Sequence, residues 1–176
     1  MTLSEVVPHL KAFELVVVTG PQRSGTTIAT IILADSLGYA SVLEEAFRED
    51  DLFRFGATLY NRRRCVVQAP AMAAICHLIK NPAIAVVFMM RPLADIVSSQ
   101  NRIGWTATHD GYEKRKYLVP EDDPRPIASV KTQAWRLQKS ILGSRAFELA
   151  YDSLAAHHLW VPRGLRTDFG PRQTTL

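Results

Sequence analysis

The sequence predicts a three-layer α/β/α domain built around a mostly parallel sheet of about five strands. Short apolar runs of strand length alternate along the chain with segments of helical periodicity. One run, Ile84–Met90, is apolar throughout, which is typical of a parallel strand covered on both faces. The 176 residues suit one compact domain with a substantial core, and we expect residues 1–176 to form that domain.

Residues 14–68 contain three expected strands and one expected helix. The strand Glu14–Thr19 is rich in β-branched residues, and the helix Thr26–Leu37 follows it. Gly38 is placed to end that helix, because glycine readily adopts the left-handed conformation of a helix C-terminus. Short strands are expected at Tyr39–Leu43 and at Cys65–Gln68.

Further elements are expected on both sides of the central apolar strand. A helix is predicted to begin after Pro70 and to carry Met72, Ile75, Leu78 and Ile79. The next helix begins near Pro92, since proline suits a first helical turn, and runs to about Asn101.

The pattern then breaks between Ile103 and Pro126, which show no clear period. A loop of this length inside a compact domain is usually functional or disordered, so residues 103–126 are a candidate lid. A helix returns over Ile127–Leu142, and a strand is expected at Phe147–Tyr151. The predicted apolar face of the helix carries Ile127, Val130, Ala134, Leu137 and Ile141.

Composition excludes several classes of protein. No apolar run is long enough to cross a membrane, and the N-terminus does not resemble a signal peptide. The two cysteines make neither a disulfide framework nor a zinc site, so a cytoplasmic location is expected. The net charge of +4 favours an anionic ligand, but no base-reading motif indicates a nucleic-acid partner.

The most informative segment is VVVTGPQRSGTT, from Val16 to Thr27. A strand, a glycine-bounded loop and a helix N-terminus follow one another, which is the geometry that binds phosphate and similar anions. An ATP-binding P-loop has the pattern G-x-x-x-x-G-K-[ST], whereas Thr26 stands here at the lysine position. Arg23 is the one cation in the loop.

Five loop residues are candidate anion ligands. Gly25 allows close approach of the backbone, the hydroxyl groups of Ser24, Thr26 and Thr27 can donate hydrogen bonds, and Arg23 can neutralise charge. The alternative is a tight strand-to-helix turn with a capping hydroxyl group.

A second candidate site begins at the end of strand Ile84–Met90. Arg91 stands where open α/β sheets bind ligands, at the carboxyl end of a strand. Ser99 follows eight residues later on the next helix. The two side chains together are placed to bind a second phosphate, although without the glycine loop a solvated arginine and a surface serine are the better interpretation.

Taken together, the two motifs resemble the sulfotransferases that use 3′-phosphoadenosine 5′-phosphosulfate (PAPS). The 5′-phosphosulfate loop of that family reads much like PQRSGTT, and its 3′-phosphate motif has the spacing of Arg91, Asp95 and Ser99. Two weaker matches are Gln68–Ala69–Pro70, at the family's Lys-Ser-Pro strand end, and Tyr151–Leu154, at its Tyr-Glu-Asp-Leu. The resemblance covers most of residues 14–154.

The resemblance implies a reaction and a set of roles. PAPS would be the sulfuryl donor and a small molecule or saccharide the acceptor, with no metal required. Arg23 would stabilise the leaving phosphate, and Arg91 and Ser99 would bind the 3′-phosphate. Glu44 or Glu45, just after the second strand, would be the general base. Aromatic residues of the segment 103–126 would cover the acceptor: Trp105, Tyr112 and Tyr117.

Two other functions stay open. An ATP-dependent small-molecule kinase with a degenerate P-loop would need Mg²⁺ and a carboxylate at a central strand end. A non-catalytic nucleotide-binding protein is favoured by Gln68, which stands where the family has a lysine. The sequence identifies neither the acceptor nor the oligomeric state.

Overall fold

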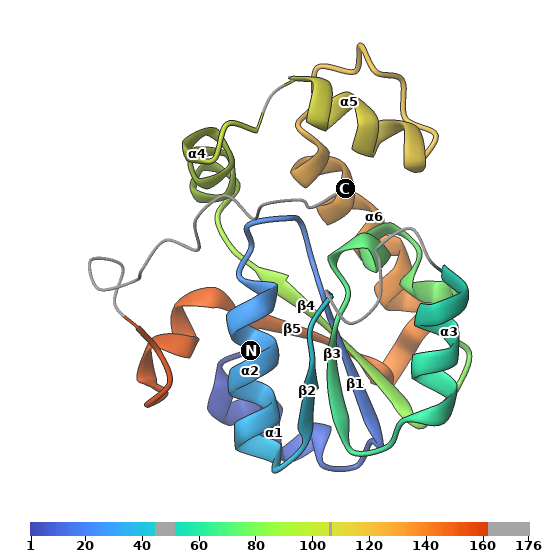
Figure 1. The fold of residues 1–176 in the computed structure, drawn as a ribbon, viewed down its shortest axis with the longest axis vertical. Coiled ribbons are helices and arrows are strands. Elements are labelled where there is room, and N and C mark those ends of the chain that lie inside the picture. Colours follow the sequence, from blue (N-terminus) through green and yellow to red (C-terminus); the bar gives the residue numbers. More distant parts are fainter. Residues whose placement is uncertain (45–51, 106, 162–176) are drawn as a thin grey trace, which may run out of the picture.

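Five strands form a single, fully parallel sheet in the order β2-β3-β1-β4-β5. Figure 1 shows this sheet in the computed structural model, which describes residues 1–44, 52–105 and 107–161. The predicted α/β fold class is confirmed, and the predicted strands agree with the observed ones to within a residue or two. The strands are β1 (Leu15–Thr19), β2 (Ala40–Val42), β3 (Cys65–Gln68), β4 (Ile84–Met90) and β5 (Ala146–Ala150).

Helices cover both faces of the sheet, and successive side chains of β1 pack against helices on opposite faces. Val16 and Val18 pack in one apolar cluster with α1 (Leu3–Leu10) and α2 (Thr26–Leu37). Val17 faces the opposite layer, because successive side chains of a strand point to opposite sides. That layer contains α3 (Leu52–Asn61), α6 (Ile127–Leu142) and two short 3₁₀ turns.

Two helices stand beyond the carboxyl ends of the strands, α4 (Leu93–Arg102) and α5 (Ala107–Lys116) (Figure 1). The loop between β1 and α2 ends at the same edge of the sheet. Strand β1 lies between β3 and β4, so side chains that follow these two strands flank this loop. The sheet therefore presents the loop, α4 and α5 on one side of the molecule.

The helix predicted after Pro70 is instead a pair of 3₁₀ turns, Pro70–Ala74 and Cys76–Leu78. Side chains from elsewhere bond the carbonyl groups of this segment: Tyr117 Oη donates to Ala71 O at 2.6 Å, and Gln138 Nε2 donates to Ala73 O at 2.8 Å. These tertiary hydrogen bonds satisfy carbonyl groups that an α-helix would have used internally.

The predicted loop 103–126 contains the helix α5, so that prediction was wrong in part. Asp110 of α5 accepts a 3.1 Å hydrogen bond from the Ile127 backbone N–H at the start of α6 and pairs with Lys114 Nζ at 2.9 Å. The segment is thus folded against α6. The N-terminal helix α1 and the helix α3 were also absent from the sequence prediction.

The buried face of α6 differs from the predicted one. Leu137 and Ile141 are 73% and 59% exposed, whereas Trp135 is buried and stacks on Phe88 with ring centroids 4.8 Å apart. The fully buried Lys131 also lies on this face.

Across the described residues, no helix combines the length and the apolar character that crossing a membrane requires.

Candidate functional site

The loop between Thr19 and Thr26 holds an unusual backbone. Gly20 and Gly25 have φ angles of +145° and +98°, and Arg23 has a φ of +72°. A left-handed arginine is strained, and such strain persists only where surrounding contacts hold it. Arg91 Nη1 donates a 2.8 Å hydrogen bond to Arg23 O and supplies one such contact.

Both loop glycines also lie close to neighbouring side chains inside the protein. A Cβ on Gly25 would lie 2.5 Å from the ring of Tyr151. A Cβ on Gly20 would lie 2.8 Å from Ser24 Oγ and 3.3 Å from Met89 Cβ. The sequence suggested that glycine admits an anion; the structure adds that glycine lets the loop pack on Tyr151 and Met89.

The hydroxyl groups of the loop fall into two environments. Ser24 is buried, and its Oγ has no hydrogen-bond partner. Gln68 Nε2, at the end of β3, donates to Thr27 Oγ1 at 3.0 Å and lies 3.5 Å from Thr26 Oγ1. Both threonine oxygens act as acceptors here, which directs their hydrogens away from Gln68.

The two predicted anion motifs meet in the fold. Arg23 Nε donates to Ser99 Oγ of α4 at 3.3 Å, and the Arg91 guanidinium lies 4.3 Å from the centroid of the Tyr151 ring. The Nε of Arg91 is buried without a hydrogen-bond partner. Arg23 and Arg91 therefore both place a positive charge at the loop, and two such charges favour a bound anion.

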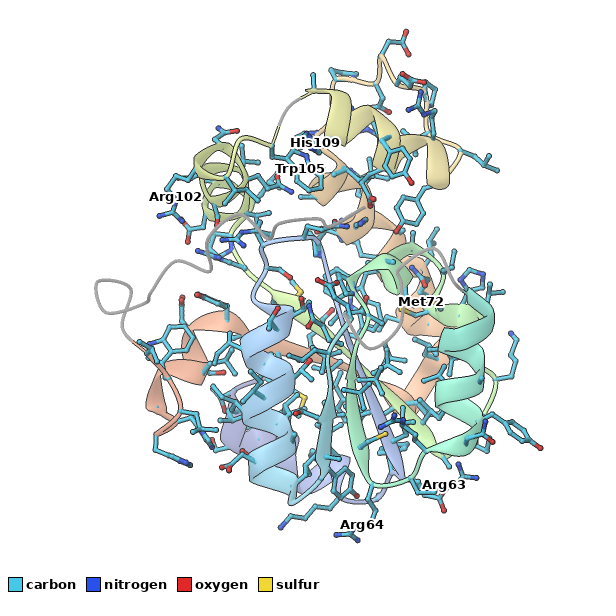
Figure 2. All side chains as sticks on the ribbon, viewed as in Figure 1. Arg63, Arg64, Met72, Arg102, Trp105 and His109 are labelled. Carbon is cyan, nitrogen blue, oxygen red and sulfur yellow. The ribbon has the colours of Figure 1, made fainter. Side chains whose placement is uncertain are left out.

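Other predicted residues lie farther out or outside the described residues. Glu44 is half-buried after β2, and β3 separates β2 from the loop-bearing β1. Glu45 lies outside the described residues. Figure 2 shows Trp105 and His109 together near α4 and α5, with ring centroids 5.4 Å apart. Tyr112 is exposed.

Three consecutive arginines follow α3, Arg62–Arg64. Arg63 and Arg64 lie at the opposite end of the molecule (Figure 2). Arg63 pairs with Glu14 at 2.8 Å, and the Arg64 guanidinium lies 5.0 Å from the Tyr39 ring centroid. Arg63 and Arg64 therefore add no positive charge at the loop, whereas Arg23 and Arg91 both contact it.

Sequence reasoning missed a buried polar cluster that holds the loop to α5 and α6. Lys131 Nζ lies 2.8 Å from Glu113 Oε2 and donates to Gln22 Oε1 at 2.6 Å. Gln22 Nε2 donates to the same Glu113 oxygen at 3.0 Å. The Lys131 and Glu113 side chains are 0% and 6% exposed. We call these three residues the buried triad.

Comparison with known proteins gives a structural match but no sequence match. No protein-family model matches the chain, and no curated protein sequence matches it significantly. Among solved structures, the chain is similar to shikimate kinase from Acinetobacter baumannii in complex with shikimate, with 14% sequence identity and a TM-score of 0.46. That likeness covers 81% of this chain and 86% of the kinase chain.

The arrangement is chemically suited to hold an anionic group. The loop at a helix N-terminus supplies one guanidinium group and a buried hydroxyl group, and the end of β4 supplies the second guanidinium group. No cluster of metal-ligating side chains is found at this loop among residues 1–44, 52–105 and 107–161.

We expect Gly25→Ala to lower the free energy of unfolding by about 2–4 kcal/mol, because the methyl group would overlap the Tyr151 ring and the φ is positive. The matched control is Gly38→Ala, which also has a positive φ but meets no atom within 4 Å, and which should cost about 1 kcal/mol. Urea unfolding compares the two, and equal losses would contradict the packing account.

Lys131→Met should destabilise the protein by about 3–5 kcal/mol, since it leaves the Glu113 carboxylate buried without its counter-charge. The double variant Lys131→Met/Glu113→Gln should recover a large part of that loss. As a control, Lys139→Met breaks the half-exposed pair with Glu148 and should change stability by about 1 kcal/mol or less. Chemical unfolding measures all three; a double variant no more stable than Lys131→Met would argue against the buried charge as the cause.

Proposed function

We propose that this protein transfers a sulfuryl group from PAPS to a hydroxyl or amine group of a small molecule or saccharide. In this proposal the segment Arg23–Thr27 binds the 5′-phosphosulfate, and Arg91 and Ser99 bind the 3′-phosphate. Glu44 or Glu45 takes the proton of the acceptor. The helix α5 and its flanking aromatic residues cover the acceptor.

The observation that carries the proposal is the meeting of the two anion motifs. Arg23 of the loop contacts Ser99, and Arg91 bonds the backbone of Arg23, although these residues are separated by up to 76 positions in the sequence. A donor with two anionic groups needs two cationic subsites at one place. Ser24 Oγ and Arg91 Nε, both buried and without hydrogen-bond partners, are suitable donors for such a ligand.

The chemistry required of the chain is modest. The acceptor oxygen or nitrogen attacks sulfur, the bond from sulfur to the 5′-phosphate oxygen breaks, and adenosine 3′,5′-bisphosphate leaves. Negative charge develops on the leaving phosphate, where Arg23 and the N-terminus of α2 stabilise it. The base accepts the proton lost by the acceptor. The proposed reaction uses no metal.

A kinase is the alternative enzyme. Two features of the chain argue against it. Thr26 replaces the lysine that would contact the transferred phosphate. The residues at the ends of β3 and β4 are Gln68 and Arg91 rather than carboxylates. The carboxylate of Glu113 does contact the loop residue Gln22, but it is paired with Lys131.

A non-catalytic nucleotide-binding role is favoured by one observation. Gln68 donates hydrogen bonds toward the loop threonines where a lysine would supply a positive charge. Such a protein would bind the bisphosphate product without turning over any acceptor.

Calorimetric titration with adenosine 3′,5′-bisphosphate and with ATP, each with and without Mg²⁺, separates these functions. We expect the bisphosphate to bind more tightly than ATP and independently of Mg²⁺, since the two arginines supply the charge that a metal would supply in a kinase. Tighter binding of ATP with Mg²⁺ would overturn the proposal in favour of a kinase.

Arg91→Ala should weaken the bisphosphate at least about tenfold more than it weakens adenosine 5′-phosphate, because the lost guanidinium contacts the 3′-phosphate. The control Tyr151→Phe keeps the ring on which Arg91 packs and should leave both affinities nearly unchanged. Calorimetry gives the four dissociation constants. Equal losses for both nucleotides would mean that Arg91 acts through the loop backbone instead.

A further inference from the structure

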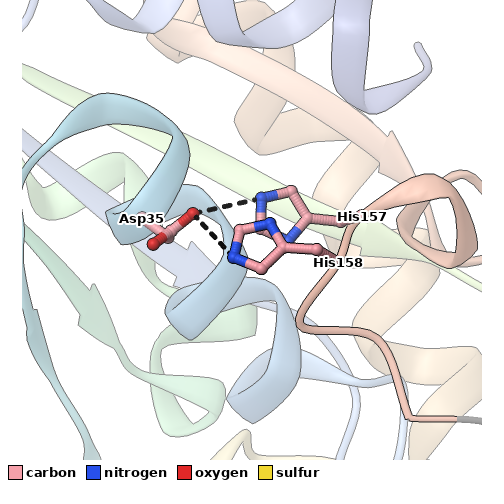
Figure 3. Close-up of side chains that lie close together, drawn as sticks. All are labelled: Asp35, His157 and His158. Carbon is pink, nitrogen blue, oxygen red and sulfur yellow. Dashed lines mark ion pairs between the residues drawn. The ribbon is translucent and has the colours of Figure 1, made fainter.

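Three metal-ligating side chains converge on the side of the sheet that α2 covers. They lie away from the loop between Thr19 and Thr26, which we call the anion loop. Asp35 lies in the last turn of α2, and His157 and His158 follow the 3₁₀ segment Tyr151–Ala156. Figure 3 shows both imidazole rings turned toward the Asp35 carboxylate. One donor atom from each residue lies within 4.8 Å of the other two.

Two of the three distances between these donor atoms suit a shared ion. His157 Nε2 and His158 Nε2 lie 3.4 Å and 3.7 Å from Asp35 Oδ2. Both separations exceed a good N–H···O hydrogen bond, which spans about 2.7–3.2 Å. They are close to the edge of a zinc tetrahedron, which is about 3.3–3.5 Å for metal–ligand bonds of about 2.0–2.1 Å. Small rotations of the side chains would complete the geometry.

The fold brings these residues together from segments more than 120 positions apart. Leu154 is buried against the apolar face of α2, and Leu159 and Trp160 pack on the same cluster. Residues 157 and 158 therefore lie between two buried or packed segments of the chain, beside the C-terminal turn of α2. Ser36 Oγ lies 3.3 Å from His157 Nε2 and donates to Ile32 O, so it also fixes the surroundings of the ring.

We propose that Asp35, His157 and His158 bind a divalent late first-row metal ion of the zinc class. Two imidazole nitrogens and one carboxylate suit Zn²⁺ or Co²⁺, whereas Mg²⁺ and Ca²⁺ prefer sets of oxygen ligands. His158 is 70% exposed, which leaves water to complete the coordination. The ion joins the end of α2 to the chain after β5.

This metal site is separate from the proposed transfer reaction. Asp35 stands nine residues after Thr26 on one straight helix, which places it about 13–14 Å along α2 from the anion loop. Its role is to fix the C-terminal segment against α2. The site would remain if the proposed sulfotransferase activity were disproved, because none of its ligands takes part in that activity.

Metal binding has a specific consequence at His157. The Leu159 backbone N–H donates to His157 Nδ1 at 3.2 Å, so that nitrogen carries no hydrogen in this arrangement. Coordination through Nε2 moves the ring proton to Nδ1, and the contact with the Leu159 N–H must then open. The amide resonance of Leu159 therefore reports on coordination.

The test titrates the tag-free protein with Zn²⁺ by calorimetry and with Co²⁺ by visible absorption. We expect one saturable site and a Co²⁺ spectrum of tetrahedral or five-coordinate type. His158→Gln and Asp35→Asn, both at exposed positions, should each weaken Zn²⁺ binding by about tenfold or more. The control His9→Gln removes a histidine at another place on the surface and should leave the affinity unchanged.

Two further measurements distinguish coordination from a simple ion pair. Zn²⁺ should shift the Leu159 amide resonance in the unaltered protein and not in His158→Gln. It should also raise the melting temperature of the unaltered protein alone, because a ligand that binds only the folded state stabilises it. Equal Zn²⁺ affinity in His158→Gln, Asp35→Asn and the unaltered protein, or no saturable Co²⁺ spectrum, would overturn the proposal.

Discussion

The buried ion pair between Lys131 and Glu113 is the interaction on which the positions of the anion loop, α5 and α6 depend, at the carboxyl ends of the strands. Both side chains are almost fully buried, and a charge removed from water must be compensated nearby. The pair joins α6 to α5, and Gln22 bonds both partners, which extends the connection to the anion loop. One cluster thus sets the position of the loop relative to two helices that are distant in the sequence.

The loop itself is held in a strained conformation from several directions. Arg23 adopts a left-handed backbone, its carbonyl accepts a hydrogen bond from Arg91, and its side chain reaches Ser99. The ring of Tyr151 fills the space beside Gly25, and the Arg91 guanidinium stacks on the same ring. Because these contacts already fix the backbone, an anion arriving at the loop would find its donors largely preorganised.

The two proposed sites use opposite ends of the same helix. In the proposed function the backbone N–H groups at the N-terminus of α2 would bind an anion, and Asp35 near the C-terminus lies close to two histidines. A metal ion at Asp35 would anchor the chain that follows Tyr151, the residue on which both Gly25 and Arg91 pack. The architecture therefore connects the metal site to the anion loop through α2 and through Tyr151, without shared ligands.

Local sequence determined the sheet and the loop. The β-branched runs of β1 and β3, the apolar β4 and the glycine that ends α2 are signals that a few neighbouring residues carry. The spacing of Arg91 and Ser99 predicts a second anion motif, and both residues contact the loop. These features were predictable because each depends on residues close together in the chain.

Tertiary structure alone decided the rest, because the relevant contacts join distant residues. The helix α5 is polar on all sides and showed no periodicity, since a buried ion pair rather than an apolar stripe attaches it to α6. Lys131 lies inside and Leu137 outside, contrary to the apolar pattern. Lys131 can be buried because Glu113 compensates its charge and Gln22 accepts a hydrogen bond from it. The cluster of Asp35 with two histidines likewise exists only once α2 and the chain after β5 pack together.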